Sequence, residues 1–291
     1  MVDQAERLRT LISGKRESVM EFKKTMRVIA VTSGKGGVGK TNFALNLAIF
    51  FAKSKSRVVL IDADFGLANV ELLLGISPRY SFKDVLSGEA TITEALTAGP
   101  EGMRFLSGGS GLTQLADVAE AQIALLLDGF NKLGEMTDVL IIDTGAGISK
   151  SVTNFLKASH EAIVVTTSDP TAITDAYAVM KAIAEHTDEP PQLKIVLNRV
   201  ESQREGTEVF ERLRRVCTRF LNMKPQYLGS IPYDKHLVRA VKSQEPVVLM
   251  YPTAESSRSI EMIGRRLLNE PDLPQSGIKS FVSRWIGIMR S

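Results

Sequence analysis

VIAVTSGKGGVGKTNFALNLAIFFA, at residues 28–52, is the stretch that decides the fold of this 291-residue chain. It starts with an apolar run typical of a buried strand, continues through a glycine-rich loop and ends in a segment of helical composition. Strand, loop and helix in this order form a P-loop, in which glycines let backbone N–H groups converge on phosphates at a helix N-terminus. The stretch therefore predicts a nucleotide-phosphate site.

The loop carries the residue types that nucleotide binding needs. Lys40 places a positive charge near the β- and γ-phosphate oxygens, and the Thr41 hydroxyl is a suitable ligand for Mg²⁺. We therefore expect a nucleoside triphosphate and Mg²⁺ to bind here. The residues expected around the nucleotide are Gly34, Lys35, Gly36, Gly37, Val38, Gly39, Lys40, Thr41 and Asn42.

The rest of the chain alternates apolar runs with longer amphipathic segments. Such alternation predicts an α/β fold with a mostly parallel, doubly wound P-loop NTPase sheet and helices on both faces. The strand-like runs are residues 28–33, 58–62, 103–108, 139–144, 162–167, 193–200 and 225–232.

Four parts of the chain follow from its patterning. Residues 1–24 start with a helical apolar pattern at 3–12 and continue as a polar and basic tether. Residues 25–268 form the P-loop domain. The run NEPDLPQSG at 269–277 contains two prolines and a glycine and is a predicted linker. Residues 278–291 are a separate last segment.

Composition restricts the class of protein. The net charge of +3 is small for this length, 44% of the residues are apolar, and no apolar run is long enough to cross a membrane. The charged N-terminus does not resemble a secretory signal, so we expect a cytoplasmic protein. The single cysteine, Cys217, excludes a disulfide or a CxxC metal site within one chain, and the three histidines show no metal-ligand spacing.

Acidic residues follow two of the predicted strands. Asp62 and Asp64 come directly after the apolar run at 58–61. Asp143 follows four apolar residues in the Walker-B arrangement, in which an aspartate binds magnesium through water. Because the carboxyl ends of parallel strands meet at one sheet edge, these carboxylates are expected near the phosphates. The alternative for Asp62 or Asp64 is a helix cap.

A second lysine, Lys35, opens the glycine run, and the resulting KGGxGK[ST] pattern resembles the deviant Walker-A family that includes MinD, ParA, nitrogenase iron protein and the arsenite-pump ATPases. The resemblance implies slow, Mg²⁺-dependent ATP hydrolysis coupled to formation of a homodimer. In that family the early lysine reaches across the dimer to the partner's nucleotide. By resemblance, Lys35, Lys40 and Asp64 are catalytic, with Asp64 orienting the attacking water. The magnesium residues are then Thr41, Asp62 and Asp143.

Base recognition is predicted at two further strand ends. The family resemblance places adenine between the Asn198 side chain and the loop formed by Pro232, Tyr233 and Asp234. The alternative is a guanine site, because the run NRVE at 198–201 distantly resembles the NKxD guanine motif, with Arg for Lys and Glu for Asp. We favour ATP.

The last segment has one fully apolar helical face. Lysine and arginine flank that face, which is the composition of an interfacial helix that lies in anionic headgroups. We therefore expect peripheral association with the cytoplasmic membrane in the ATP-bound state. The alternative is a helix docked on its own domain, and both arrangements can hold in turn if ATP binding releases the helix. The apolar residues are Ile278, Phe281, Val282, Trp285, Ile286 and Met289.

The N-terminal run DQAERLR at 3–9 is similar to the DQAxxLR activator motif of the FlhG family of flagellar regulators. In that family the motif stimulates the signal-recognition-particle-type GTPase FlhF, and flagellar C-ring proteins are further partners. Judged only by its residues, the segment is a short helix or a disordered tail. The resemblance implies that the contacts to FlhF come from Asp3, Gln4, Ala5, Leu8 and Arg9.

Other branches of the deviant Walker-A family fit less well. Nitrogenase-type reductases need at least two cysteines per subunit to hold a bridging cluster, and this chain has one. The runner-up is a ParA-like partition ATPase that binds DNA non-specifically, supported by the basic helix at 207–222 and by Arg258, Arg265 and Arg266. Solvated helices carry such charges routinely, so nucleic acid is not an expected partner.

Overall fold

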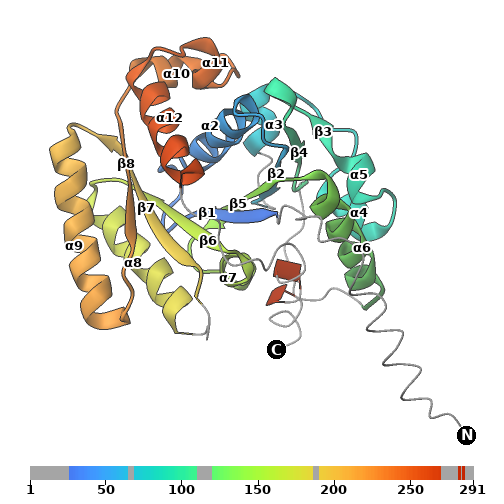
Figure 1. Cartoon of the computed structure of the whole chain (residues 1–291), viewed down its shortest axis with the longest axis horizontal. Helices are drawn as coiled ribbons and strands as arrows, with labels where there is room; N and C mark the ends of the chain where they lie inside the picture. Colours follow the sequence, from blue (N-terminus) through green and yellow to red (C-terminus); the bar gives the residue numbers. More distant parts are fainter. Residues whose placement is uncertain are drawn as a thin grey trace, which may run out of the picture.

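An eight-stranded, mostly parallel sheet is the framework of the structure. The computed structural model describes residues 26–64, 69–109, 120–185, 190–269, 281–282 and 284–285. The strands are β1 (Arg27–Ser33), β2 (Val58–Ala63), β3 (Thr97–Ala98), β4 (Arg104–Leu106), β5 (Val139–Ala146), β6 (Glu161–Thr166), β7 (Gln192–Val200) and β8 (Gln226–Pro232). Their order in the sheet is β3-β4-β2-β5-β1-β6-β7-β8 (Figure 1).

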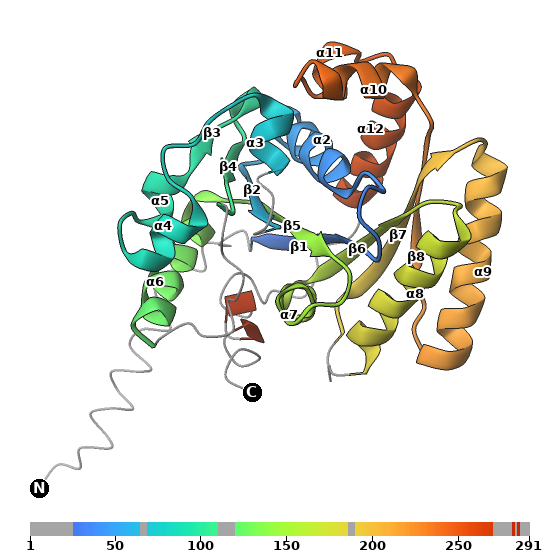
Figure 2. The same cartoon turned by 180° about the vertical axis from the view of Figure 1, so that it is seen from behind.

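Helices connect these strands and cover the sheet on both sides, as Figures 1 and 2 show from opposite directions. They are α2 (Lys40–Lys53), α3 (Asn69–Leu74), α4 (Phe82–Ser87), α5 (Ile92–Ala95), the 3₁₀ turn η1 (Pro100–Gly102), α6 (Glu120–Met136), α7 (Lys150–Ala158), α8 (Pro170–Ala184), α9 (Gln203–Leu221), α10 (Lys235–Lys242), α11 (Val247–Met250) and α12 (Glu255–Leu268).

The alternation of side chains along the strands creates a separate core on each face. In β1, Ile29 and Val31 pack into the core that also contains residues of α2, α11 and α12. Val28 and Ala30 point the other way, into the cores built with α4 to α9. Because both faces are covered, every strand residue of β1 after the first is buried. The predicted α/β fold class is confirmed.

The sheet topology places the site. β1 lies between β5 and β6, and the chain proceeds from it to β2 on one side and from β6 to β7 and β8 on the other. Ligands of such open sheets bind where the strand order reverses, outside the carboxyl ends of the strands. The glycine-rich loop after β1 lies at this point, and so do the predicted acidic residues at the ends of β2 and β5.

All seven predicted strands are present, and one strand was missed. β3 has two residues, too few for an alternating pattern, and it pairs antiparallel with β4 at the sheet edge. Every other neighbouring pair in the sheet is parallel. Among the described residues no helix combines the length and the apolar character that a membrane span requires.

The described part of the C-terminal segment packs on the domain. Phe281, Val282 and Trp285 are at most 3% exposed. The Trp285 ring stacks on Phe155 of α7 at 5.3 Å between centroids and meets Phe130 of α6 edge-on at 5.7 Å. For these residues the structure has the docked arrangement that the sequence left open. The predicted membrane residues Ile278, Ile286 and Met289 lie outside the described residues, as do the linker after Asn269 and the whole activator segment at 1–24.

Candidate nucleotide site

The glycine-rich loop connects Ser33, the last residue of β1, to Lys40, the first residue of α2. Gly37 and Gly39 have φ angles of 77° and 93°, a left-handed conformation that glycine adopts at no steric cost. Gly34 has a different role, because a Cβ there would lie 2.1 Å from the Asp175 carbonyl carbon in α8. The first glycine of the loop therefore permits close packing of α8.

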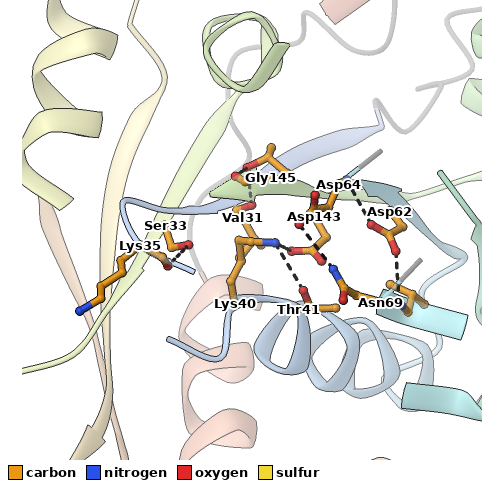
Figure 3. A network of polar contacts seen from close by, with 12 residues as sticks. Val31, Ser33, Lys35, Lys40, Thr41, Asp62, Asp64, Asn69, Asp143 and Gly145 are labelled. Atoms are coloured by element: carbon orange, nitrogen blue, oxygen red, sulfur yellow. Dashed lines mark hydrogen bonds and ion pairs between the residues drawn. The ribbon is translucent and has the colours of Figure 1, made fainter. Parts of the chain in front are cut away.

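Lys40 and the Walker-B aspartate form a buried ion pair below the loop. Lys40 Nζ lies 2.7 Å from Asp143 Oδ1, and the two side chains are 7% and 0% exposed. Lys40 Nζ also lies 3.4 Å from Thr41 Oγ1. Figure 3 shows these three side chains pointing toward one another. The predicted positive charge, magnesium-binding hydroxyl and carboxylate are thus brought together.

Asp62 and Asp64 lie beside this pair at the end of β2. The Asp62 carboxylate accepts hydrogen bonds of 3.1 Å from the backbone N–H groups of Asp64 and Val70, so it also holds the start of α3. Asp64 Oδ2 accepts a hydrogen bond of 3.4 Å from Asn69 Nδ2. A Cβ added at Gly145 would lie 3.7 Å from Asp64 Oδ1. Asp64 therefore faces Gly145, near the end of the Walker-B strand β5.

The carboxylates suit a divalent cation. Burial, and next the charge of Asp143, raise the pKa of Asp62 to about 7. Burial also raises the pKa of Asp143, although Lys40 opposes this effect. Asp143 Oδ2 has no hydrogen-bond donor among the described residues. A Mg²⁺ ion favours the ionised forms of such groups, and Thr41, Asp62 and Asp143 would hold it directly or through water.

Phosphate oxygens and water must complete the ligand shell of that ion. Within the described ranges, no group of three or more His, Cys, Asp or Glu side chains could hold a metal by itself. Mg²⁺ in nucleotide enzymes typically takes one or two protein ligands together with phosphates and water. The residues present therefore fit magnesium delivered with a nucleotide.

A cavity of about 980 Å³ opens over the loop, at the upper end of the range for ligand pockets. Its wall brings together predicted site residues from distant segments of the chain. Gly34, Lys35 and Val38 do not line the cavity, and Asp62 and Asp143 are buried beneath it. The predicted residues in the wall are Gly36, Gly37, Gly39, Lys40, Thr41, Asn42, Asp64, Asn198, Pro232, Tyr233 and Asp234.

The predicted base-binding residues are already engaged with the protein. Asn198 Nδ2 donates to the Val38 carbonyl oxygen at 2.7 Å. Asp234 Oδ1 accepts from the backbone N–H of His236, which caps α10, and Asp234 Oδ2 accepts from the N–H and hydroxyl of Ser256 at the start of α12. These contacts fix the wall of the cavity, and the assignment to adenine stays a prediction.

Lys35 lies apart from the other charged groups of the site. Its Nζ donates to Thr171 Oγ1 at 2.7 Å and lies 3.5 Å from Asp169 Oδ2, both at the start of α8. The side chain is 46% exposed, and Figure 3 shows it extending away from Lys40. This geometry agrees with a lysine that serves a second subunit, a role that stays a prediction.

Sequence reasoning missed three polar residues that shape the site. Ser33 Oγ donates to the Lys35 carbonyl oxygen at 3.0 Å. Thr144 Oγ1 bonds the carbonyl oxygens of Val31 and Gly145 at 3.2 and 2.9 Å, joining the P-loop strand to the Walker-B strand. Asn69 is the third. A hydroxyl at the buried end of an apolar strand was the available signal for Ser33 and Thr144, whereas nothing in the pattern pointed to Asn69.

The fold and this site together define a P-loop nucleotide-binding enzyme. The chain belongs to the CobQ/CobB/MinD/ParA nucleotide-binding domain family, whose sequence pattern matches residues 29–247. It is therefore an ATP-hydrolysing P-loop enzyme of the MinD/ParA type.

Two curated relatives are similar over nearly the whole chain. Antiactivator FleN of Pseudomonas aeruginosa is 37% identical over 263 residues, which cover 90% of this chain and 94% of FleN. The flagellum site-determining protein YlxH of Helicobacter pylori is 35% identical over 292 aligned positions, 98% of each chain. The resemblance to FlhG-type proteins is confirmed.

Solved structures of MinD share the fold. MinD from Aquifex aeolicus is 28% identical with a TM-score of 0.65 and covers 86% of this chain and 99% of its own. MinD complexed with Mg-ADP from Pyrococcus horikoshii has a TM-score of 0.68, covers 84% and 96%, and is 23% identical, so this likeness concerns the fold alone.

Proposed function

We propose that this protein is a MinD-type ATPase switch that regulates the number or placement of flagella. The names of its relatives FleN and YlxH describe an antiactivator and a flagellum site-determining protein. The alignment with YlxH covers 98% of both chains, so it includes most of the two terminal segments as well as the ATPase domain. Those segments distinguish a regulator from an isolated nucleotide-binding domain.

ATP with Mg²⁺ is the proposed ligand, and a homodimer is the proposed active form. Phosphoryl transfer needs an in-line water, neutralised phosphate charge and closed loops. Lys40 and the carboxylates supply charge and positioning within one subunit. Lys35 is directed out of its own cavity and is exposed, so a second subunit would bring a lysine to each nucleotide and make ATP binding depend on association.

The observation that carries the switch is the position of Trp285. This side chain stacks on Phe155, which belongs to α7, and α7 follows the Walker-B strand β5 after the three-residue loop at 147–149. Gly147 in that loop has a φ of 90°. A change in the conformation of the loop at 147–149 on binding of the γ-phosphate would therefore move α7, the helix that holds the C-terminal segment. ATP binding would release that segment.

The magnitudes suit a reversible membrane switch. A helix of about a dozen residues is marginal in water and binds a bilayer only modestly. Two released copies on an ATP dimer bind far better, because insertion of the second copy is effectively intramolecular. We therefore infer a cytoplasmic protein that associates peripherally with anionic headgroups of the cytoplasmic membrane when ATP is bound.

A DNA-binding partition function has less support. Among the basic residues of the helix at 207–222 that suggested it, Arg214 pairs with Glu211 within α9. Arg265 of α12 pairs with Glu261 in the same way. Charges neutralised within their own helix contribute little to a field that attracts phosphate backbones. Proteins of the flagellar C-ring remain the more suitable class of partner.

The flagellar role also predicts that the N-terminal segment activates FlhF. A peptide spanning Met1 to Lys24 should stimulate GTP turnover by purified FlhF. Replacing Gln4 by Ala in that peptide should remove the stimulation, because Ala cannot make the hydrogen bonds that the Gln4 side chain would make at the interface with FlhF. A peptide of the same composition in scrambled order is the control. Unstimulated turnover would leave a MinD-like membrane ATPase with a different client.

A further inference from the structure

We propose that Asn198 is a positioning residue for the phosphate loop, so that it sets affinity for the triphosphate whichever base is attached. The inference deepens the proposed nucleotide site and rests on it. Family resemblance assigns Asn198 to the adenine. The contacts of its side chain with the loop at 34–39 point to the phosphates as well.

The Asn198 amide is the link between β7 and the P-loop. Its Nδ2 donates to the Val38 carbonyl oxygen at 2.7 Å, and its Oδ1 accepts from the Arg199 N–H at 2.9 Å. Asn198 and Val38 are 7% and 5% exposed. A Cβ added at Gly39 would lie 2.3 Å from Asn198 Nδ2. The amide thus lies directly against the turn that leads into α2.

The contact with Asn198 fixes the orientation of the peptide group between Val38 and Gly39. The Val38 C=O and the Gly39 N–H belong to the same planar unit and point in opposite directions. Holding the carbonyl oxygen toward Asn198 turns the Gly39 N–H away from Asn198 and toward the phosphate side of the loop. Without the donor, the buried carbonyl oxygen lacks a partner and the peptide is free to rotate.

The backbone of β7 is shaped to aim this side chain. The register between β7 and β8 shifts between Asn198 and Val200, and Arg199 between them has a φ of 56°. A bulge with a left-handed residue is an unfavourable conformation that re-aims neighbouring side chains and persists where the surroundings require it. Here it directs Asn198 out of the strand pattern and onto the loop.

The same bulge also contacts the loop formed by Pro232, Tyr233 and Asp234, where the base is predicted to bind. The Tyr233 N–H donates to the Val200 carbonyl oxygen at 3.1 Å, and Pro232 pairs with Val200. Asn198 therefore joins the phosphate side of the cavity to its base side. Its amide keeps one N–H and one lone pair for a base, so the two roles are separable by experiment.

The test compares three ligands on the full chain: Mg-ATP, Mg-GTP and Mg-tripolyphosphate, which lacks a base. In the Asn198→Ala protein we expect roughly tenfold weaker binding of Mg-tripolyphosphate, the effect of one unsatisfied buried carbonyl, and a loss of affinity at least as large for Mg-ATP and Mg-GTP. KM for ATP should rise by a similar factor while kcat changes little, since the contact is the same before and during the reaction.

Tyr233→Ala is the matched control, because Tyr233 lines the predicted base side of the cavity and its backbone N–H bonds Val200 of β7. This variant should bind Mg-ATP more weakly and bind Mg-tripolyphosphate as tightly as the wild type. Asn198→Asp keeps the size of the side chain and the acceptor for the Arg199 N–H but lacks the donor to Val38. It replaces the Ala variant if that variant does not fold. Its loss of affinity for all three ligands should be at least as large as that of Asn198→Ala. Unchanged tripolyphosphate affinity in both Asn198 variants would overturn the proposal. A wild type that binds none of the ligands would instead refute the nucleotide site.

Discussion

Replacing Asp64 with Ala lowers kcat for ATP hydrolysis roughly 100-fold or more, the usual contribution of a group that positions and activates a nucleophile, while the Kd for ATP stays within about threefold of the wild type. Asp64 lies at the wall of the cavity, against Gly145 and beside Asn69. Unlike Asp62 and Asp143, it is not assigned to the magnesium ion, so its loss should spare binding. Phosphate release and equilibrium titration measure the two quantities.

Asn69→Ala is the graded control for this variant. Asn69 lines the cavity and bonds Asp64 through one contact of 3.4 Å, so its removal should lower kcat a few-fold, in keeping with a single weak hydrogen bond. An Asp64→Ala protein that hydrolyses ATP at the wild-type rate would show that the carboxylate next to the γ-phosphate is a different one.

Two changes at the aromatic contact should shift membrane binding in opposite directions. Trp285→Ala removes a membrane-facing ring from each released helix, so the ATP dimer should bind anionic vesicles on the order of 100-fold more weakly. Phe155→Leu leaves the C-terminal segment intact but removes the stacking partner that α7 offers to Trp285, a contact worth roughly 1 kcal/mol. Binding of the ADP-bound variant to anionic vesicles should then rise several-fold.

Sedimentation with vesicles that contain phosphatidylglycerol measures both effects. Vesicles of phosphatidylcholine alone are the control for charge, and the Tm of each nucleotide-free variant controls for folding, since Phe155 is a core residue. If Phe155→Leu bound vesicles in ADP no better than the wild type, the contact between α7 and Trp285 would not restrain the helix.

Local sequence sufficed for the phosphate site because the P-loop is formed by adjacent residues. The strand, the glycines, Lys40 and Thr41 lie within one short stretch, and the carboxylates follow apolar runs whose ends must meet at one sheet edge. The strand pattern therefore predicted both the fold and the place of Asp143 near the phosphate loop. The direct bond between Asp143 and Lys40, which lie 103 residues apart in the chain, was not predicted.

Contacts between side chains from separate elements could not be predicted in this way. Lys35 meets Thr171, and Asn198 meets Val38, because helices and strands pack at angles that no periodicity specifies. The docking of Trp285 on Phe155 has the same origin. An amphipathic helix has the same sequence pattern whether its apolar face meets a membrane or its own domain, so the sequence left both open.

The fluorescence of Trp285 is the most direct test of the proposed switch, because it is the single tryptophan of the chain and is 2% exposed when docked. In the Asp64→Ala protein without vesicles, Mg-ATP should shift its emission to longer wavelength as the ring enters water, whereas Mg-ADP should leave it unchanged. Emission that stays the same in saturating Mg-ATP would contradict an ATP-driven release of the C-terminal helix.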